Sequence, residues 1–364
     1  MTNILVQILL TFVAALICSL ILIPIIIKLS IKLNLVDKPN ERKVHKTPIP
    51  RLGGVAIFLS AVLAIILSNS GLKAISNWPV MFTSVGVLFM VGIWDDLKDI
   101  SAKLRFALQI CCAIAVASTG IRLTSLHGIL GINELNVVWQ YIITVLIIVG
   151  VTNSFNLIDG VDGLAGGLAF IGVCVLIGLS YQLKVYPLMI VLLAFAGALI
   201  GFLKNNLNPA KIFMGDGGSL VLGYLLSTTG ILLIERSAAN PALMHPSRVA
   251  VLITAILIIP VFDTVRVFTS RMKRGISPFQ ADKTHIHHLF LVAGLDHRKT
   301  SSMIHLFELV LVAIALFIPG TTSISIAIVT MVMLFHIITV ILNINQQMEH
   351  WLAFVKKMEK EGIA

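Results

Sequence analysis

The sequence predicts an all-α polytopic integral membrane protein with about eleven transmembrane helices. Of its 364 residues, 57% are hydrophobic and only 12% are charged, whereas soluble proteins carry about 25% charged residues. Apolar runs recur along the whole chain, and a run of about 20 such residues can cross the hydrocarbon of a bilayer. Lipid is therefore the expected surrounding of most of this chain.

Eleven apolar windows are long enough to be considered as spans. They are 4–27, 53–69, 79–94, 104–120, 138–154, 163–180, 185–202, 217–234, 248–268, 301–318 and 322–343. No positively charged segment precedes the first window, and no cleavage site of small residues follows it. That pattern indicates a retained span and not a signal peptide. We expect one transmembrane domain covering residues 1–364.

The distribution of basic residues predicts the orientation. One set of connecting segments comprises 28–52, 95–103, 155–162, 203–216, 269–300 and the tail 344–364. With the adjoining helix ends, it carries 22 of the 27 lysine and arginine residues. Cytoplasmic loops carry such an excess, so we expect the N-terminus outside and the C-terminus in the cytoplasm. The same bias explains the net charge of +10 without a nucleic-acid partner.

Acidic residues stand at the predicted cytoplasmic ends of two windows. Asp95 and Asp96 directly follow window 79–94, and Asp216 directly precedes window 217–234. Paired carboxylates near hydrocarbon are costly, and they are either solvated at a helix end or share a cation or a proton. Asp216 could cap its helix, or the free N–H groups there could bind phosphate. Proteins usually hold Mg²⁺ with one or two carboxylates plus substrate phosphates, so these positions predict a Mg²⁺ site, with Mn²⁺ as a substitute.

A second polar segment, "TNSFNLIDGVDGLAGG", joins windows 138–154 and 163–180. Asn153, Asn156, Asp159 and Asp162 alternate there with glycines. Glycine permits a close approach of the backbone to a ligand, and the amides and carboxylates can bond a sugar or a base. A polar turn is the alternative. We expect these four residues to bind substrate.

Histidines form the third cluster. Asp263 and Arg266 are three residues apart in window 248–268, which favours a local ion pair, and both are also candidate substrate-binding residues. "HIHH" follows with His285, His287 and His288. On a regular helix His285 and His288 would share a face and His287 would point elsewhere. Imidazoles could ligate zinc or bond a diphosphate beside basic groups. The many aspartates favour the Mg²⁺-diphosphate explanation, and zinc stays open.

The first basic loop, "DKPNERKVHKTPIPRLGG", allows two interpretations. It could anchor the protein to anionic lipid headgroups. Alternatively, Arg42, Lys43 and His45 could bind a phosphorylated substrate. Together, the clusters suggest one cytoplasmic site for phosphoryl transfer between a soluble nucleotide and a lipid phosphate, where the protein acts by positioning and charge neutralisation.

The same motifs carry a resemblance to a known family. "DD" at 95–96, "NSFNLIDGVDGLAGG", "NPAKIFMGDGGSL", "SPFQADKTHIHHL" and "RKVHKTPIPRLGG" resemble those of the bacterial polyprenyl-phosphate N-acetylhexosamine-1-phosphate transferases. The resemblance covers residues 37 to about 290, and the WecA/TagO type is the best match. It implies a bacterial inner-membrane enzyme with a cytoplasmic active site. From UDP-N-acetylglucosamine or a related UDP-N-acetylhexosamine, the enzyme would transfer sugar-1-phosphate to undecaprenyl phosphate and release UMP.

The resemblance also implies roles for the acidic residues. Asp216 would be the main Mg²⁺ ligand, with Asp96 nearby. Asp95 would assist the lipid phosphate, with its action as a base left open. Lys103 would help to neutralise phosphate. These roles are expectations from family motifs and do not follow from the spacing of the residues.

The remaining implied roles concern the donor substrate. Phe213 and Asn206 would contact the uracil, and Asp159 and Asp162 would lie near the nucleoside. The three histidines would engage the diphosphate or the sugar. Related enzymes are often homodimers, and the sequence leaves the oligomeric state open.

Three alternatives remain at this stage. The related MraY type transfers phospho-MurNAc-pentapeptide, but it typically has three consecutive histidines and "PTMGG" where this chain has "HIHH" and "PIPRLGG". An ion-coupled transporter would place its polar residues near the middle of spans, whereas here they gather at span ends. A sensor of lipid or nucleotide on the same scaffold would bind substrate without releasing UMP.

Overall fold

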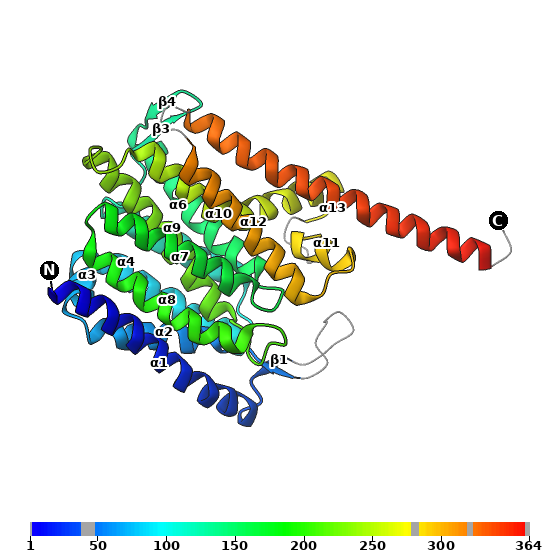
Figure 1. Cartoon of the computed structure of the whole chain (residues 1–364), viewed down its shortest axis with the longest axis horizontal. Coiled ribbons are helices and arrows are strands. Elements are labelled where there is room, and N and C mark those ends of the chain that lie inside the picture. The colour runs from blue at the N-terminus through cyan, green and yellow to red at the C-terminus, as the bar shows by residue number, and fades with distance from the viewer. Residues whose placement is uncertain (1, 38–47, 278–283, 319–322, 361–364) are drawn as a thin grey trace.

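A computed structural model of the chain describes residues 2–37, 48–277, 284–318 and 323–360 (Figure 1). Within this part, thirteen helices and four short strands follow one another. The helices are α1 (Thr2–Lys32), α2 (Gly53–Ile66), α3 (Asn69–Asn77), α4 (Pro79–Lys98), α5 (Ala102–Ser118), α6 (Val137–Ile158), α7 (Leu164–Gln182), α8 (Tyr186–Asn206), α9 (Asp216–Ala239), α10 (Pro246–Lys273), α11 (Ile286–Val292), α12 (His297–Phe317) and α13 (Ile324–Lys360). The strands are β1 (Val36–Asp37), β2 (Ile49–Pro50), β3 (Ser125–Ile129) and β4 (Ile132–Glu134).

The strands form two separate antiparallel pairs. β1 pairs with β2, and Val36 lies opposite Pro50. β3 pairs with β4, and Ser125 lies opposite Glu134. The β3–β4 hairpin falls in segment 121–137, where the sequence predicts only a connecting loop. Both pairs lie at the ends of the helix bundle and not in its core (Figure 1).

The long helices lie side by side and define two ends of the bundle (Figure 1). We call the end with Asp96 and Asp216 the carboxylate end, and the end with residues 125–134 the hairpin end. α9 begins at the carboxylate end with Asp216 and reaches the hairpin end, where Glu235 accepts hydrogen bonds from Thr124. Figure 1 shows α1 beginning at the hairpin end and α13 extending past the opposite end.

Helix α9 is the centre of the bundle. Every residue from Gly217 to Ile234 is buried, and α2, α4, α6, α7 and α10 pack around it. By contrast, α1 exposes large apolar side chains along one face, including Leu9, Ile17 and Ile25. A fully buried apolar helix surrounded by helices with exposed apolar faces is the arrangement expected of a protein whose outer surface meets lipid.

The number of membrane-crossing helices agrees only in part with the prediction of eleven. In the described part of the chain, nine helices are long and apolar enough to cross a membrane, and the bent pair α2–α3 raises the number to as many as ten. α2 and α3 meet at an angle of 105°. α5 has 17 residues, or about 26 Å at 1.5 Å per residue, which is short for a span. Every predicted window nevertheless coincides with one helix.

Glycines let α2 and α4 approach the start of α9 at backbone distance. A Cβ atom at Gly54 would lie 2.1 Å from the Gly218 nitrogen, and one at Gly92 would lie 2.5 Å from the carbonyl oxygen of Asp216. Helices in membranes commonly pack through small residues in this way, because dispersion contacts replace the hydrophobic drive. The two contacts fix the ends of α2 and α4 against the first turn of α9.

This packing generates a prediction for two glycines of the same helix. Gly92→Ala should lower the melting temperature of the purified protein, because overpacking of this kind costs about 1–3 kcal/mol. Gly86→Ala is the matched control, because a Cβ atom there would meet nothing within 4 Å. We expect the control to melt at the wild-type temperature or slightly above it, since alanine favours the helix. Equal melting temperatures for the two variants would contradict the close approach.

Candidate active site

Asp96 caps the N-terminus of α9 from the neighbouring helix. Its two carboxylate oxygens accept hydrogen bonds from the backbone N–H groups of Asp216 and Gly217, both at 3.0 Å. A carboxylate is favourable at this position because the N–H groups and the helix dipole attract negative charge. Gly215 precedes the helix with φ of 72°, and a Cβ atom there would lie 2.7 Å from Asp96 Oδ2. Glycine is therefore required for both conformation and space.

Arg105 joins the other two predicted catalytic carboxylates. Its Nη1 donates to Asp95 Oδ2 and, at 2.8 Å, to Asp216 Oδ2. Asp95 Oδ1 also accepts the N–H of Ile100, and Asp216 Oδ1 accepts Asn156 Nδ2 at 2.6 Å. The structure thus brings Asp95, Asp96 and Asp216 together as the sequence predicts. It adds an arginine that the motif-based reasoning counted only as loop charge.

The loop after α6 supplies a fourth carboxylate. Asp159 lies immediately after the last residue of α6. Burial raises the pKa of Asp159 to about 7, and the nearby carboxylates of Asp216, Asp96 and Asp162 add to the shift. Four carboxylates therefore gather at the carboxylate end, close to Arg105 and, at Asp96, to Arg51.

Asp162 and Asn206 connect loops and engage backbone groups. Asp162 Oδ2 accepts the N–H of Ala210 at 3.0 Å. Asn206 is buried, its Oδ1 accepts the N–H of Gly163, and its Nδ2 donates to the carbonyl of Ile212. These bonds hold the α6–α7 loop against the segment before α9. The predicted contact of Asn206 with a base stays a prediction, and in this arrangement both ends of its amide already have backbone partners.

The Asp263–Arg266 ion pair is confirmed, and it anchors the histidine segment. Asp263 Oδ1 accepts Arg266 Nη2 at 2.8 Å and the N–H of Ile286 at 2.9 Å, while its Oδ2 lies 2.8 Å from His285 Nδ1. Arg266 also donates to the carbonyl of Thr284. One buried carboxylate thus ties α10 to the start of α11.

The expected helical geometry of the three histidines is wrong. His285 is the residue before α11 and has extended backbone angles, so it does not share a helical face with His288. Its ring instead lies parallel to that of His287, with 5.8 Å between centroids, and the rings of His287 and His288 are 4.4 Å apart. A regular-helix pattern fails here because the Asp263 bonds to His285 and Ile286 begin the helix one residue later.

His287 connects this segment to the α6–α7 loop. It is 2% exposed, and a Cβ atom at Gly160 would lie 2.7 Å from its Nε2. Burial lowers the pKa of His287 to about 3, and the adjacent His288 adds to the shift. The lowered pKa favours the neutral form of this imidazole, which can offer a hydrogen bond to a ligand.

His297 is a further histidine that motif reasoning missed. It begins α12, and its Nδ1 lies 3.4 Å from Asp162 Oδ1. Its position nine residues after "HIHH" places it outside the cluster, so spacing alone gave no signal. Contact with Asp162 makes it a neighbour of the same loop that carries Asp159.

The remaining predicted residues lie around this core or outside the described part. Lys103 is exposed in the first turn of α5. Asn153 donates to Gln109 Oε1 and to the carbonyl of Val149. The backbone of Phe213 pairs with Pro50 and Gly53. Three predicted ligands in the first loop fall outside the described residues, and they are Arg42, Lys43 and His45.

A large apolar cavity opens beside these groups. It has a volume of about 1430 Å³ and lies between α5, α6, α9 and α10. Polar side chains at the carboxylate end line its mouth, including Arg105, Asn156 and His288, and residues of strand β3 line the far end. A groove that is polar at one end and apolar along its length fits a ligand with a charged head and a long hydrocarbon tail.

Comparison with known proteins identifies the family. The sequence profile of glycosyl transferase family 4 matches residues 78–234. A Bacillus subtilis (strain 168) protein named "Probable undecaprenyl-phosphate N-acetylglucosaminyl 1-phosphate transferase" is 33% identical over 332 residues, or 90% of each chain. This chain belongs to the polyprenyl-phosphate N-acetylglucosaminyl 1-phosphate transferase family.

Two more members of this transferase family are similar over most of their length. The decaprenyl-phosphate N-acetylglucosaminephosphotransferase of Mycolicibacterium smegmatis is 33% identical over 293 residues, which is 74% of this chain and 71% of that protein. The undecaprenyl-phosphate alpha-N-acetylglucosaminyl 1-phosphate transferase of Escherichia coli (strain K12) is 31% identical over 288 residues, or 77% and 75% of the two chains. The motif-based assignment to this transferase family is confirmed, and the transporter alternative is left without support.

The contact of His297 with Asp162 generates a prediction about the α6–α7 loop. His297→Ala should speed the exchange of the backbone amide hydrogen of Ala210, because Asp162 accepts that N–H and loses a neighbouring contact. We expect the exchange rate to rise about fivefold. Such a rise corresponds to a loss of about 1 kcal/mol in the free energy of local opening, which is the most that a partly exposed His297–Asp162 pair contributes. Hydrogen–deuterium exchange with mass spectrometry measures it.

The matched control is His336→Ala, which removes an exposed imidazole from α13. Its exchange around residue 210 should equal that of the wild type. Acceleration in the control, or none in His297→Ala, would contradict the proposed tie.

Proposed function

We infer that this protein transfers N-acetylglucosamine-1-phosphate from UDP-N-acetylglucosamine to a polyprenyl phosphate, with undecaprenyl phosphate as the acceptor and UMP as the product. The single observation that carries the proposal is the apolar cavity of about 1430 Å³ that opens on the carboxylate and imidazole cluster. Such a site suits an acceptor whose tail stays in the membrane while its phosphate reacts at the surface. The names of the relatives specify N-acetylglucosamine, which favours this sugar over phospho-MurNAc-pentapeptide.

The acceptor phosphate is expected at the mouth of the cavity. Arg105 lines the mouth and contacts Asp95 and Asp216, so it offers a guanidinium to a phosphate at this end of the cavity. Guanidinium groups bind phosphate with charge-assisted hydrogen bonds. Lys103, two residues earlier in the first turn of α5, would add a second positive charge. We propose that these two residues receive the lipid phosphate.

The chemistry of the carboxylates fits Mg²⁺. Asp96 and Asp216 would hold it, in keeping with the habit of Mg²⁺ to take one or two carboxylates plus substrate phosphates. When bound, the ion would neutralise charge on the donor diphosphate. Among the described residues, no three histidine, cysteine or carboxylate side chains stand ready to hold a metal ion alone, so phosphate oxygens would complete the coordination. Mn²⁺ has the same preference for oxygen ligands.

The donor would lie between the α6–α7 loop and the histidine segment. Asp159 and Asp162 belong to this loop, and His287 of the histidine segment touches the loop at Gly160, so the donor would lie beside this contact. Since its neutral form is favoured, His287 would orient the diphosphate or sugar by hydrogen bonding. Asn153, Asn156, Phe213, Asp263 and Arg266, together with His285 and His288, stay as proposed substrate-site residues.

In the proposed reaction, an oxygen of the lipid phosphate attacks the β phosphorus of the UDP-sugar. A new P–O bond forms there, the bond to the bridging oxygen breaks, and UMP leaves with the electron pair. The protein contributes by aligning the two anions and compensating their charge. Asp95 is held by Arg105 and Ile100, which suits a positioning role, and a proton transfer to it is not needed when the acceptor phosphate is already ionised.

We also propose eleven crossings with the N-terminus outside, in the bacterial inner membrane. The contacts of α5 support its crossing, because Arg105 near its start meets Asp216 and Thr124 beyond its end meets Glu235. Asp216 and Glu235 are at opposite ends of α9, so α5 and the segment after it together reach from one end of that helix to the other, while α5 itself packs against α4 and α6. With the bias of basic loops, this topology puts the carboxylate end in the cytoplasm, where nucleotide sugars are made.

The test is UMP release by detergent-purified protein given undecaprenyl phosphate, Mg²⁺ and a panel of UDP-sugars. Asp216→Asn should lower turnover by at least about 100-fold while the protein stays folded, because a metal ligand is lost. Asp99→Asn is the matched control, since Asp99 is exposed at the end of α4 with φ of 47°, a conformation that asparagine also tolerates. Full turnover with EDTA, or in Asp216→Asn, would refute the metal assignment.

A second prediction tests the cavity. Thr254 lines it in the half near the hairpin end, and Thr254→Trp should raise KM for undecaprenyl phosphate about tenfold, because each displaced methylene contact is worth about 0.8 kcal/mol. A short-chain prenyl phosphate should be much less affected. The matched control is Thr330→Trp, which alters the exposed face of α13. In each variant the lost Thr hydroxyl was bonded to the carbonyl four residues earlier. Equal KM values for the long acceptor in the two variants would contradict the proposed path of the tail.

A further inference from the structure

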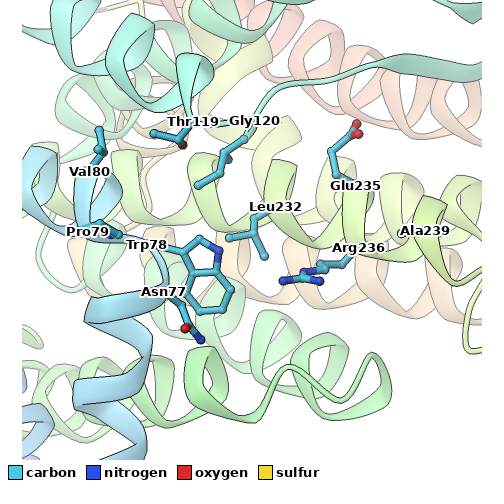
Figure 2. A pocket seen from close by; sticks show the side chains of 11 residues that line it. Asn77, Trp78, Pro79, Val80, Thr119, Gly120, Leu232, Glu235, Arg236 and Ala239 are labelled. Carbon is cyan, nitrogen blue, oxygen red and sulfur yellow. The ribbon is translucent and has the colours of Figure 1, made fainter.

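A second cavity lies at the opposite end of the bundle from the carboxylates. It has a volume of about 520 Å³ and is formed where α3, α5 and α9 end and α4 begins. Figure 2 shows Trp78, from the junction of α3 and α4, facing Leu232 and Arg236 of α9. The proposed transfer reaction uses none of these residues, and a cavity at helix ends lies at the depth where membrane proteins meet lipid headgroups.

Two hydrogen-bond donors face this cavity without an acceptor. Arg236 is exposed in the last turn of α9, and Trp78 is half-buried. Within the described residues, neither the guanidinium nor the indole N–H has a hydrogen-bonding partner. Figure 2 shows the Arg236 side chain extending toward the indole. A guanidinium beside an indole N–H is a donor set for an anionic oxygen group such as phosphate.

The same cavity also presents one carboxylate. Glu235 accepts the N–H of Thr124 at 3.0 Å and its hydroxyl at 2.8 Å, so the carboxylate is fixed in place, and it forms no ion pair with any residue that the structure describes. Figure 2 shows Glu235 and Arg236 leaving α9 in different directions. The wall therefore carries one positive and one negative group at separate points, together with the apolar side chains of Val80 and Ile121.

We propose that this cavity binds the headgroup of a phospholipid that carries a primary amine, namely phosphatidylethanolamine. The phosphate pairs with Arg236 and the Trp78 N–H, the ammonium pairs with Glu235, and an acyl chain begins along Val80 and Ile121. Charge complementarity selects this lipid, because phosphatidylglycerol offers no cation to Glu235. Phosphatidylcholine carries a cation, but its quaternary ammonium has no N–H to donate.

The experiment is native mass spectrometry of the delipidated full chain in detergent. Phosphatidylethanolamine, phosphatidylglycerol and phosphatidylcholine with the same acyl chains are added one at a time. The wild type should bind one molecule of phosphatidylethanolamine more tightly than either other lipid. Arg236→Gln should weaken that binding about tenfold, which corresponds to about 1.4 kcal/mol. Lys73→Gln is the control, because it removes an exposed positive charge from α3 at the same end but outside the cavity.

Glu235→Gln separates the two halves of the headgroup. It should abolish the preference for phosphatidylethanolamine over phosphatidylglycerol, because a neutral amide no longer attracts the ammonium. UMP release by all three variants should match the wild type in detergent, since the cavity is remote from the carboxylate end. Arg236→Gln that binds phosphatidylethanolamine as tightly as the wild type, or a wild type that binds all three lipids equally, would overturn the proposal whatever the outcome for the transfer reaction.

Discussion

The contact between Asp96 and the first turn of α9 is the constraint on which the rest of the site depends. Two backbone N–H groups at the start of α9, which is buried from Gly217 to Ile234, meet one carboxylate from α4. The contact is possible because Gly92, Gly215 and Gly217 leave room for backbone and carboxylate to meet. Once α4 is fixed in this way, Asp95 and Arg105 lie beside Asp216. The geometry of the carboxylates is therefore set by helix packing in the membrane and not by the flexible parts of the loops.

A second consequence concerns charge. The carboxylate end holds Asp95, Asp96, Asp159 and Asp216 near Arg105, and Arg51 also acts on Asp96. The buried His287 has a lowered pKa, which favours its neutral form. Two phosphorylated substrates would add further negative charge. Within the described residues, four carboxylates and two substrate phosphates would face Arg105 and Arg51, and a divalent ion in the proposed reaction would supply further positive charge. Such an ion would also explain why neutral hydrogen-bonding groups and glycines, and not more lysines, fill the space between the acidic residues.

The sequence predicted the site residues that are polar in an otherwise apolar stretch. It did not predict the features that depend on contacts between distant parts of the chain. Polar residues such as Asp95, Asp159 and His288 stand out between apolar runs. Their positions at the ends of these runs indicated where the helices end and that the polar residues gather at one end of the helix bundle. Arg105 was missed because its partner Asp216 lies 111 residues away along the chain. His297 was missed because its partner Asp162 lies 135 residues away, in the α6–α7 loop. The extended conformation of His285 depends on Asp263, a residue 22 positions earlier, and no local pattern encodes it. Likewise, α3 is a helix of only nine residues and the β3–β4 hairpin has strands of five and three residues, and elements this short are not revealed by a search for membrane spans.

The groove between α5, α6, α9 and α10 ends at strand β3. A prenyl tail that is longer than the groove must leave it there and lie among the acyl chains of the bilayer. Isoprene units beyond that exit would gain nothing from the protein that the lipid does not already provide. The enzyme would then read only the units nearest the phosphate, and it would treat carriers of ten and eleven units as nearly the same molecule.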